Sequence, residues 1–334
     1  MRVLIVAATI KDIAKILNVT CATVSKALSN QEDISVEMKS KVRKVAEELH
    51  YRPNILARGL VKNESKTIGL IIPDITNPFY PEIAQGIEET INEEGYSLIL
   101  CNSNWDKDKE NNHISLLIGK KVDGLIIAPI GIEQADAVKV DFPIITVGNK
   151  NSITEENYVV IDDEKGGYIA TSHLIENGCR SILFIGGQEN VLSNKDRLRG
   201  YKKALSDNNI EIQESNIYSR NFKRESGYMT LKEIMQSQKM PDGIFAGNDI
   251  LALGIIQAIT ESGFKIPEDI KVVGFDDIIY MQLPEISLTT IIQPKYEMGV
   301  LAAKMLLSKI KNPNVKIDNI ILEPHIAIRR TSHI

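Results

Sequence analysis

The chain has 334 residues, which is long enough for two or three structural units, and its 43% hydrophobic content is sufficient for a sizeable core. Its net charge of −5 alone argues against a nucleic-acid binder, but residues 1–62 hold 11 Lys and Arg against 6 Asp and Glu, a net +5, so the remainder carries −10. A basic head on an acidic body is typical of a small DNA-contacting module joined to a larger domain.

Cysteine count and hydropathy exclude several classes of protein. The three cysteines, Cys21, Cys101 and Cys179, are odd in number and far apart, which argues against a disulfide framework or a zinc site and favours the cytoplasm. No apolar run approaches the ~18–20 residues that span a bilayer. Residues 1–8 are apolar but lack a small-residue cleavage site, so we expect a short extra arm and not a signal peptide.

The first predicted helix begins after Thr9, which can cap it, and Asp12 stands where an acidic side chain favours a helix N-terminus. Its apolar positions follow the spacing of one helical face and are Ile10, Ile13, Ala14 and Leu17.

Two more short helices follow, the second capped by Thr20 and the third by Ser35. Their inward positions are Val24, Ala27 and Leu28 in the second and Val42, Val45, Ala46 and Leu49 in the third. Three such helices predict a helix-turn-helix unit, whose second helix enters the DNA major groove. A three-helix bundle without a binding role is the alternative.

The outer face of the second helix favours the DNA-binding interpretation. Its residues Cys21, Ala22 and Ser25 are small, so the helix can approach base edges closely. Lys26 is long enough to reach a guanine, while Thr23 and Ser25 can donate to phosphates.

A hinge is predicted after the third helix, which Pro53 breaks. Residues 54–60 can form about two helical turns, a length that is marginal alone, and Gly59 costs roughly 1 kcal/mol more. An ordinary linker is the alternative.

The segments TIKDIAKILNVTCATVSKALSN and YRPNILARGL resemble the start of a LacI/GalR-family repressor over residues 9–62. The resemblance implies that Cys21, Ala22 and Lys26 read bases, although the family more often has Arg at the Lys26 position, and Lys is not an equivalent bidentate donor. It also implies a hinge helix that orders on operator DNA, with Leu60 wedged into the minor groove. The predicted DNA-contacting residues are Thr9, Thr20, Cys21, Ala22, Thr23, Ser25, Lys26, Asn30, Asn54, Ala57 and Leu60.

From residue 66 onward, continuous apolar runs alternate with helical segments, which predicts parallel sheets covered on both faces. The span is too long for one sheet, so we expect an α/β core of two doubly wound lobes. The predicted helices include residues 83–94, 165–177, 199–208, 251–262 and 297–310.

Ligands of such sheets bind beyond the carboxyl ends of the strands, and polar and aromatic residues gather at those ends. Aromatic faces suit the C–H surface of a sugar, while Arg, Asp and Asn bind hydroxyls. The alternatives are core aromatics at Phe79 and Tyr80, a surface ion pair at Arg197, capping by Asp276 and turn chemistry at Asn248.

These segments resemble the periplasmic sugar-binding fold of LacI-family cores, with motifs matching its ribose-binding branch. The resemblance implies that aromatic side chains sandwich a sugar and polar ones hold its hydroxyls. The predicted effector-binding residues are Asn77, Phe79, Tyr80, Asn149, Arg197, Phe222, Asn248, Asp276 and Gln293. Where that branch usually has Asp-Arg, this chain has Gly148-Asn149, so two charged clamps are missing and plain ribose is disfavoured.

The domain organisation follows from the same resemblance. It consists of a helix-turn-helix head over residues 1–52, a hinge helix and linker over 53–65, a first core lobe over 66–161 plus 294–322, and a second over 162–293 plus 323–334. Two heads on one pseudo-palindromic operator multiply affinity. Since no heptad tail follows the last strand, we expect a homodimer and not a tetramer.

The leading hypothesis is a cytoplasmic DNA-binding transcriptional regulator, a repressor controlled by a small sugar-like effector. One alternative is a carbon-catabolite-type regulator controlled by a protein corepressor, and another is a solute-binding protein, which has no use for the head. An enzyme is disfavoured because the sequence has no nucleophile elbow, phosphate loop or metal-spaced histidines. We expect no cofactor, metal or membrane contact.

Overall fold

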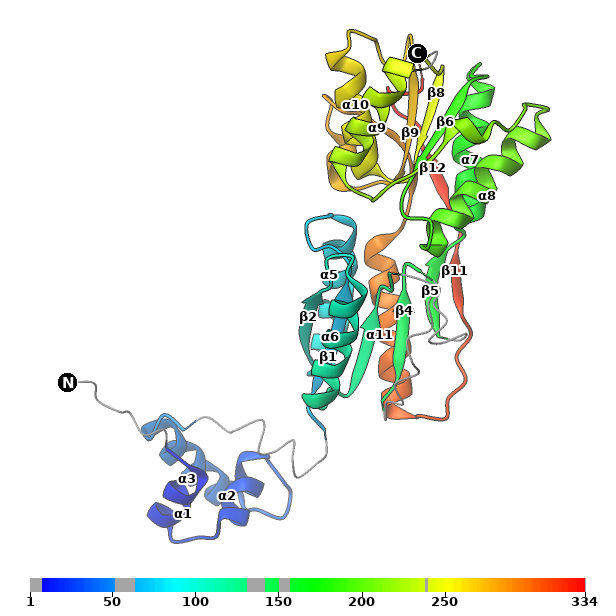
Figure 1. The fold of residues 1–334 in the computed structure, drawn as a ribbon. Helices are drawn as coiled ribbons and strands as arrows, with labels where there is room; N and C mark the ends of the chain where they lie inside the picture. Colours follow the sequence, from blue (N-terminus) through cyan, green and yellow to red (C-terminus); the bar gives the residue numbers. More distant parts are fainter. Residues whose placement is uncertain (1–7, 52–63, 131–141, 150–156, 238–239, 334) are drawn as a thin grey trace. The chain divides into compact units, whose positions relative to one another are not determined.

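The computed structural model describes residues 8–51, 64–130, 142–149, 157–237 and 240–333 (Figure 1). The chain divides into two compact units, Met1–Ser65 and Lys66–Ile334, and each is described by itself. The predicted hinge helix with Asn54, Ala57 and Leu60 lies outside the described residues, as do residues 1–7 of the predicted arm. No described helix is long and apolar enough to cross a membrane.

The first unit holds three helices, α1 (Ile10–Leu17), α2 (Cys21–Leu28) and α3 (Val36–Glu48). Their core contains the residues that the helical spacing predicted, with Leu17, Leu28, Val45 and Leu49 packed around its edge. The fully enclosed members are Ile13, Ala14, Val24, Ala27, Val42 and Ala46. The predicted three-helix head is therefore confirmed.

The predicted caps of these helices are also present. The Asp12 carboxylate accepts from the backbone N–H of Thr9 at 2.8 Å and from its hydroxyl at 2.7 Å. The Thr20 hydroxyl accepts from the N–H of Thr23 at 3.1 Å, and Ser35 caps α3 in the same way. Each contact satisfies an N–H or side chain that the start of a helix would otherwise leave without a partner.

The first sheet of the second unit is parallel throughout and has the strand order β2-β1-β3-β4-β5-β11. Its strands are β1 (Thr67–Ile72), β2 (Ser97–Asn102), β3 (Gly124–Ile127), β4 (Ile144–Val147), β5 (Tyr158–Ile161) and β11 (Ile320–Leu322). Helices α5 (Phe79–Glu93) and α11 (Lys295–Lys311) pack together over one face, and α6 (Lys107–Gly119) covers the other. Alternate side chains of β1 point to opposite faces of the sheet. Leu70 packs in the cluster with α5 and α11, and Ile71 packs in the cluster with α6.

The second sheet repeats this arrangement with the order β7-β6-β8-β9-β10-β12. Its strands are β6 (Ile182–Gly186), β7 (Ile217–Ser219), β8 (Gly243–Ala246), β9 (Lys271–Asp276), β10 (Thr289–Ile292) and β12 (His325–Ala327). Helices α7 (Asp163–Glu176) and α8 (Leu192–Asp207) cover one face, and α9 (Arg224–Ser237) and α10 (Asp249–Glu261) cover the other (Figure 1). Two short 3-10 helices, Glu214–Asn216 and Ile279–Gln282, lie in its loops.

Both sheets share the topology that creates a ligand crevice. In each, the first strand lies between the second and the third, so consecutive connections diverge at the carboxyl ends of the first and third strands. Such switch points are where doubly wound proteins bind ligands. The described chain passes from one sheet to the other between β5 and α7, between β10 and α11, and between β11 and β12.

The predicted fold class is confirmed, but several details of the prediction were wrong. Helix α8 begins at Leu192 and not near residue 199, and α5 begins at Phe79 and not near residue 83. The first turns of these helices present polar and aromatic side chains to a pocket, so the apolar periodicity starts later than the helix does. Strand β12 is antiparallel to β10, and the short, half-buried edge strand β7 was not predicted.

Candidate functional site

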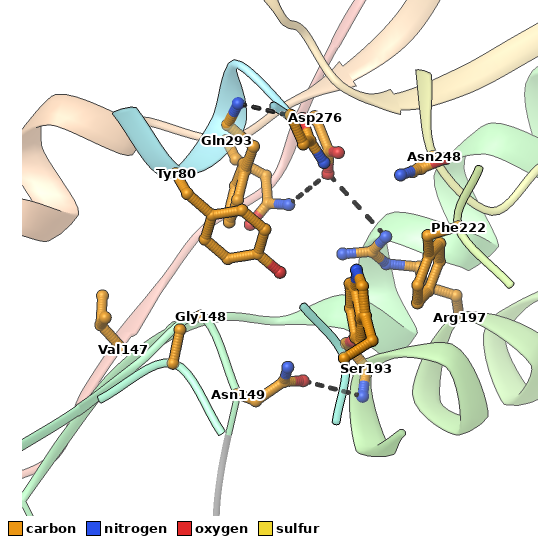
Figure 2. Close-up of a pocket in the computed structure, with 14 residues that line it drawn as sticks. Tyr80, Val147, Gly148, Asn149, Ser193, Arg197, Phe222, Asn248, Asp276 and Gln293 are labelled. Carbon is orange, nitrogen blue, oxygen red and sulfur yellow. Dashed lines mark hydrogen bonds and ion pairs between the residues drawn. The ribbon is translucent and has the colours of Figure 1, made fainter. Parts of the chain in front are cut away.

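All nine predicted effector-binding side chains line one pocket with about 410 Å³ of empty space (Figure 2). Sequence reasoning missed five further lining residues, which are Trp105, Ala128, Val147, Gly148 and Ser193. That the nine contact an effector stays a prediction.

Aromatic rings stand on two sides of this pocket. Phe79 and Tyr80 occupy the first turn of α5, with ring centroids 5.1 Å apart and planes at 87°. Phe222 follows β7, and Figure 2 shows its ring across the pocket from that of Tyr80. Phe79 and Tyr80 also belong to the buried core, so the structural alternative and the binding interpretation hold together.

Arg197 is a buried member of an ion-pair cluster and not a surface ion pair. It lies on α8, so its predicted place at a strand end was wrong. Its Nε donates to Asp163 Oδ1 at 2.8 Å and its Nη1 donates to the carbonyl oxygen of Gly247 at 2.6 Å. Nη1 also lies 3.8 Å from Asp276 Oδ1, and the guanidinium stacks 3.6 Å above the Phe275 ring centroid.

Two buried carboxyls therefore share one guanidinium. Burial raises the pKa of Asp163 to about 7, with Arg197 opposing the shift. Burial also raises the pKa of Asp276, against the pull of Arg197 and the hydrogen bond from Gln293. Because the cluster has no excess positive charge, it suits a neutral hydroxylated ligand better than an anion.

The turn that carries Asp276 is conformationally constrained. Asp276 and Asp277 have φ values of +117° and +52°, a region that L-residues seldom adopt. The Lys295 ammonium donates to their two carbonyl oxygens, at 2.9 Å and 2.7 Å. Gln293 Nε2 donates to Asp276 Oδ1 at 2.7 Å, while its Oε1 is buried without a partner and can accept from a ligand hydroxyl.

Two asparagines complete the polar lining of the pocket. Each has a structural role in the fold and also lines the pocket, so neither the structural nor the binding interpretation is sufficient alone. Asn248 caps α10 by accepting from the N–H of Leu251 at 2.9 Å, and it also lines the pocket. Asn149 Oδ1 accepts from the N–H of Ser193 at 3.2 Å, which joins the loop after β4 to the start of α8 (Figure 2). A hydrogen bond between the two sheets' elements thus stands where the ribose-binding branch has charged clamps.

The missed residues differ in how visible they are in the sequence. Trp105 follows β2 by three residues, so the strand-end rule would have found it. Asp163 follows β5 by two residues, so the same rule applies to it. Ser193 gave no signal, because its position depends on how α8 packs.

The predicted DNA-contacting face lies on α2. Cys21, Ala22, Ser25 and Lys26 are exposed and Thr23 is half-buried, while Thr9 and Thr20 are exposed helix caps. Asn30 has a φ of +56°, and its Oδ1 accepts from Arg43 Nη2 at 3.3 Å.

Lys26 already has a partner within the head, which the sequence analysis did not anticipate. Its ammonium forms an ion pair with Asp33, which lies in the loop after α2. Both side chains are about half exposed, so this pair is weak and can be exchanged for a contact with DNA.

Comparison with known proteins places both units. Residues 9–54 match the bacterial regulatory proteins of the lacI family, and residues 171–332 match a periplasmic binding protein-like domain. The HTH-type transcriptional repressor PurR of Mannheimia succiniciproducens is 32% identical over 97% of this chain and 98% of its own length.

Solved structures agree with this similarity. The lac repressor dimer bound to operator and the anti-inducer ONPF matches with a TM-score of 0.86 and 26% identity, over 97% of this chain and 99% of that one. A LacI-family regulator from Enterococcus faecium with bound ribose matches with a TM-score of 0.71 and 32% identity, over 80% of this chain and 98% of that one.

Proposed function

The chain belongs to the LacI family of bacterial regulatory proteins and is a DNA-binding transcriptional regulator, and we propose that it is a repressor whose operator affinity is set by a small sugar-like effector. The effector would occupy the pocket between the two sheets of the core. No catalytic role is part of this proposal, since the relatives are transcription regulators.

One observation carries the effector assignment. A single pocket combines aromatic rings on two sides with Arg197, Asp276 and Gln293, all buried and already oriented by one another. Stacking rings and fixed hydroxyl partners are what a neutral polyol requires. A phosphate ester is disfavoured because Asp276 lies in the same pocket and Arg197 is engaged by Asp163.

For DNA, we propose that α2 enters the major groove in each of two subunits. Its exposed face of small residues supports this, because such a helix can approach base edges closely. The net charge of +5 over residues 1–62 is modest for one head, so we propose that a dimer binds a pseudo-palindromic site.

Effector control requires two arrangements of the core that differ in effector affinity. We propose that residues 66–161 plus 294–322 and residues 162–293 plus 323–334 are lobes that close on the effector. Their movement would alter the spacing of the two hinge segments, and thereby of the heads on the operator.

The test begins by selecting an operator from random DNA with the purified protein. Operator affinity is then measured at fixed salt with and without pentoses, hexoses and nucleosides, and calorimetry measures their binding directly. We expect one ligand class to bind and to change operator affinity, and Asp276→Asn to abolish that response while DNA binding persists. Arg199→Ala, which changes an exposed helix residue outside the pocket, is the control. If no sugar or nucleoside binds at millimolar concentration, control by a protein corepressor becomes the better assignment.

A further inference from the structure

Trp105 is the only tryptophan in the chain, and its backbone is held in a rarely adopted conformation. Asn104 and Trp105 both have positive φ, +54° and +58°. The N–H of Trp105 donates to the carbonyl oxygen of Pro73 at 3.1 Å, which fixes this turn against the end of β1. Positive φ is energetically unfavourable for a bulky residue such as tryptophan, and such backbone strain is typical of functional positions.

The Trp105 indole contacts a ring that belongs to the other sheet. Trp105 follows β2 of the first sheet and Phe222 follows β7 of the second, yet their ring centroids are 5.5 Å apart with planes at 34°. Phe222 is backed by Gly187, where even a Cβ would overlap its ring. Because Phe222 has no room behind it, it offers a fixed surface for the indole.

The same indole lines the pocket and is partly exposed to solvent. Of the fourteen lining residues, twelve are buried and only Trp105 and Gly148 are partly exposed. On the Gly148 side, a Cβ would lie 3.7 Å from the buried Phe79 ring. Since Gly148 has no side chain, Trp105 is the one partly exposed side chain of this lining.

We propose that Trp105 is a specificity-determining residue that closes the pocket over a ligand of one ring and excludes glycosides that carry a second sugar ring. A second ring must displace the indole from Phe222, which removes an aromatic contact and leaves both rings without a partner. Selectivity for a one-ring ligand then comes from steric exclusion of a second ring as well as from favourable contacts. This inference rests on the proposed effector function and names its ligand class.

The principal test compares the wild type with Trp105→Ala, which removes the cover, and Trp105→Phe, which keeps an aromatic ring. Calorimetry measures binding of D-ribose, D-glucose and D-galactose, and of the disaccharides cellobiose and lactose. We expect a monosaccharide to bind the wild type and no disaccharide to do so. Trp105→Ala should raise the disaccharide-to-monosaccharide affinity ratio by at least about tenfold, while Trp105→Phe should not. Circular dichroism of both variants verifies that they fold.

A second measurement needs no sugar. Because Trp105 is the only tryptophan, acrylamide quenching of its fluorescence reports its own exposure. Quenching should be stronger in Phe222→Leu than in the wild type, and equal quenching would overturn the contact on which the proposal depends. An unchanged sugar ratio in Trp105→Ala, with monosaccharide binding intact, would overturn the proposal alone. Absence of binding of these sugars and of nucleosides by all three proteins would overturn the proposed function together with it.

Discussion

Arg197 sits among partners that the protein itself supplies. Asp163, Gly247 and Asp276 face its polar atoms, and Phe275 lies under its plane. The arginine is therefore oriented before any ligand arrives, so little ordering is left for binding to cost. The same arrangement makes Arg197 important for stability, because two buried carboxyls lie against its guanidinium.

Replacing Arg197 by Met should lower the free energy of unfolding by roughly 3–5 kcal/mol, since Asp163 loses its counter-charge and Asp276 keeps only Lys295. Urea unfolding at pH 7 measures this. The matched control is Arg199→Ala, two positions along the same helix, whose side chain is 57% exposed in its ion pairs. Arg199→Ala should lower the free energy of unfolding by less than about 1 kcal/mol. Equal costs for the two variants would contradict the buried-cluster interpretation.

The raised pKa of Asp163 predicts the direction of a pH effect. Its pKa is about 7 in the folded protein and near 4 when unfolded, so folding favours the protonated carboxyl. The contribution is fully present below the unfolded pKa and is lost as pH rises through about 7. Between pH 5.5 and 8 the wild type should lose about 2 kcal/mol more stability than Asp163→Asn. Parallel stability-pH profiles of the two proteins would contradict this prediction.

The ion pair of Lys26 with Asp33 predicts opposite effects of two substitutions on DNA binding. Lys26→Ala should weaken operator binding by ~1–3 kcal/mol relative to random DNA if Lys26 reads a guanine. Asp33→Asn should strengthen binding, because it frees Lys26 and removes a negative charge. Competition assays at one salt concentration measure both, since phosphate contacts dominate raw affinity. Equal losses on operator and random DNA would make Lys26 a backbone contact.

At the scale of elements, the site depends on how closely α7 and α8 cross. A Cβ on Gly200 of α8 would overlap the carbonyl oxygen of Glu164, and one on Gly167 of α7 would overlap that of Arg197. Only glycines allow this approach, which brings Asp163 at the start of α7 against Arg197 on α8. The ion pair is thus a consequence of helix packing.

Gly200→Ala should therefore destabilise the core by about 1–3 kcal/mol through overpacking and displace Arg197 from Asp163. Loss of effector binding should accompany the lower stability in calorimetry and urea unfolding. Gly119→Ala, at the end of α6 where a Cβ meets nothing within 4 Å, provides the control and should be neutral or slightly stabilising. A tolerated Gly200→Ala would show that the helices can separate without harm to the site.

At the scale of the whole molecule, Lys295 connects the sheets at one of the three chain crossings. It begins α11, donates to the carbonyl oxygens of Asp276 and Asp277, and lies 3.6 Å from Glu82 on α5. The turn that presents Asp276 to the pocket is thereby tied to the helix that presents Tyr80. A ligand in the pocket would then contact elements of both sheets that Lys295 connects.

Thermodynamic linkage predicts how effector and operator affect each other's binding to the regulator. The factor by which an effector changes operator affinity must equal the factor by which operator changes effector affinity. Lys295→Met should reduce both factors together, because the pocket is then less firmly tied to α5. Titrations of effector with and without operator, and of operator with and without effector, measure them. An undiminished factor in Lys295→Met would exclude Lys295 from the coupling.

What the sequence by itself determined is local in origin. Caps such as Thr20 and Ser35, the apolar stripes of α1 to α3 and the buried strand runs depend on residues a few positions apart, so their spacing predicts them. The strand-end rule, together with the family resemblance, likewise predicted that residues such as Asn248 and Asp276 would meet in the pocket, because parallel strands bring their carboxyl ends to one edge.

Only the tertiary structure decided how those residues are partnered. The Arg197–Asp163 pair, the Trp105–Phe222 contact and the Lys295 hydrogen bonds each join elements that are distant in the sequence. Whether Arg197 is free or held, and whether the pocket is open or covered, depends on the packing distance between helices and between sheets. No periodicity or short motif encodes that distance, because it results from side chains of many elements filling one core.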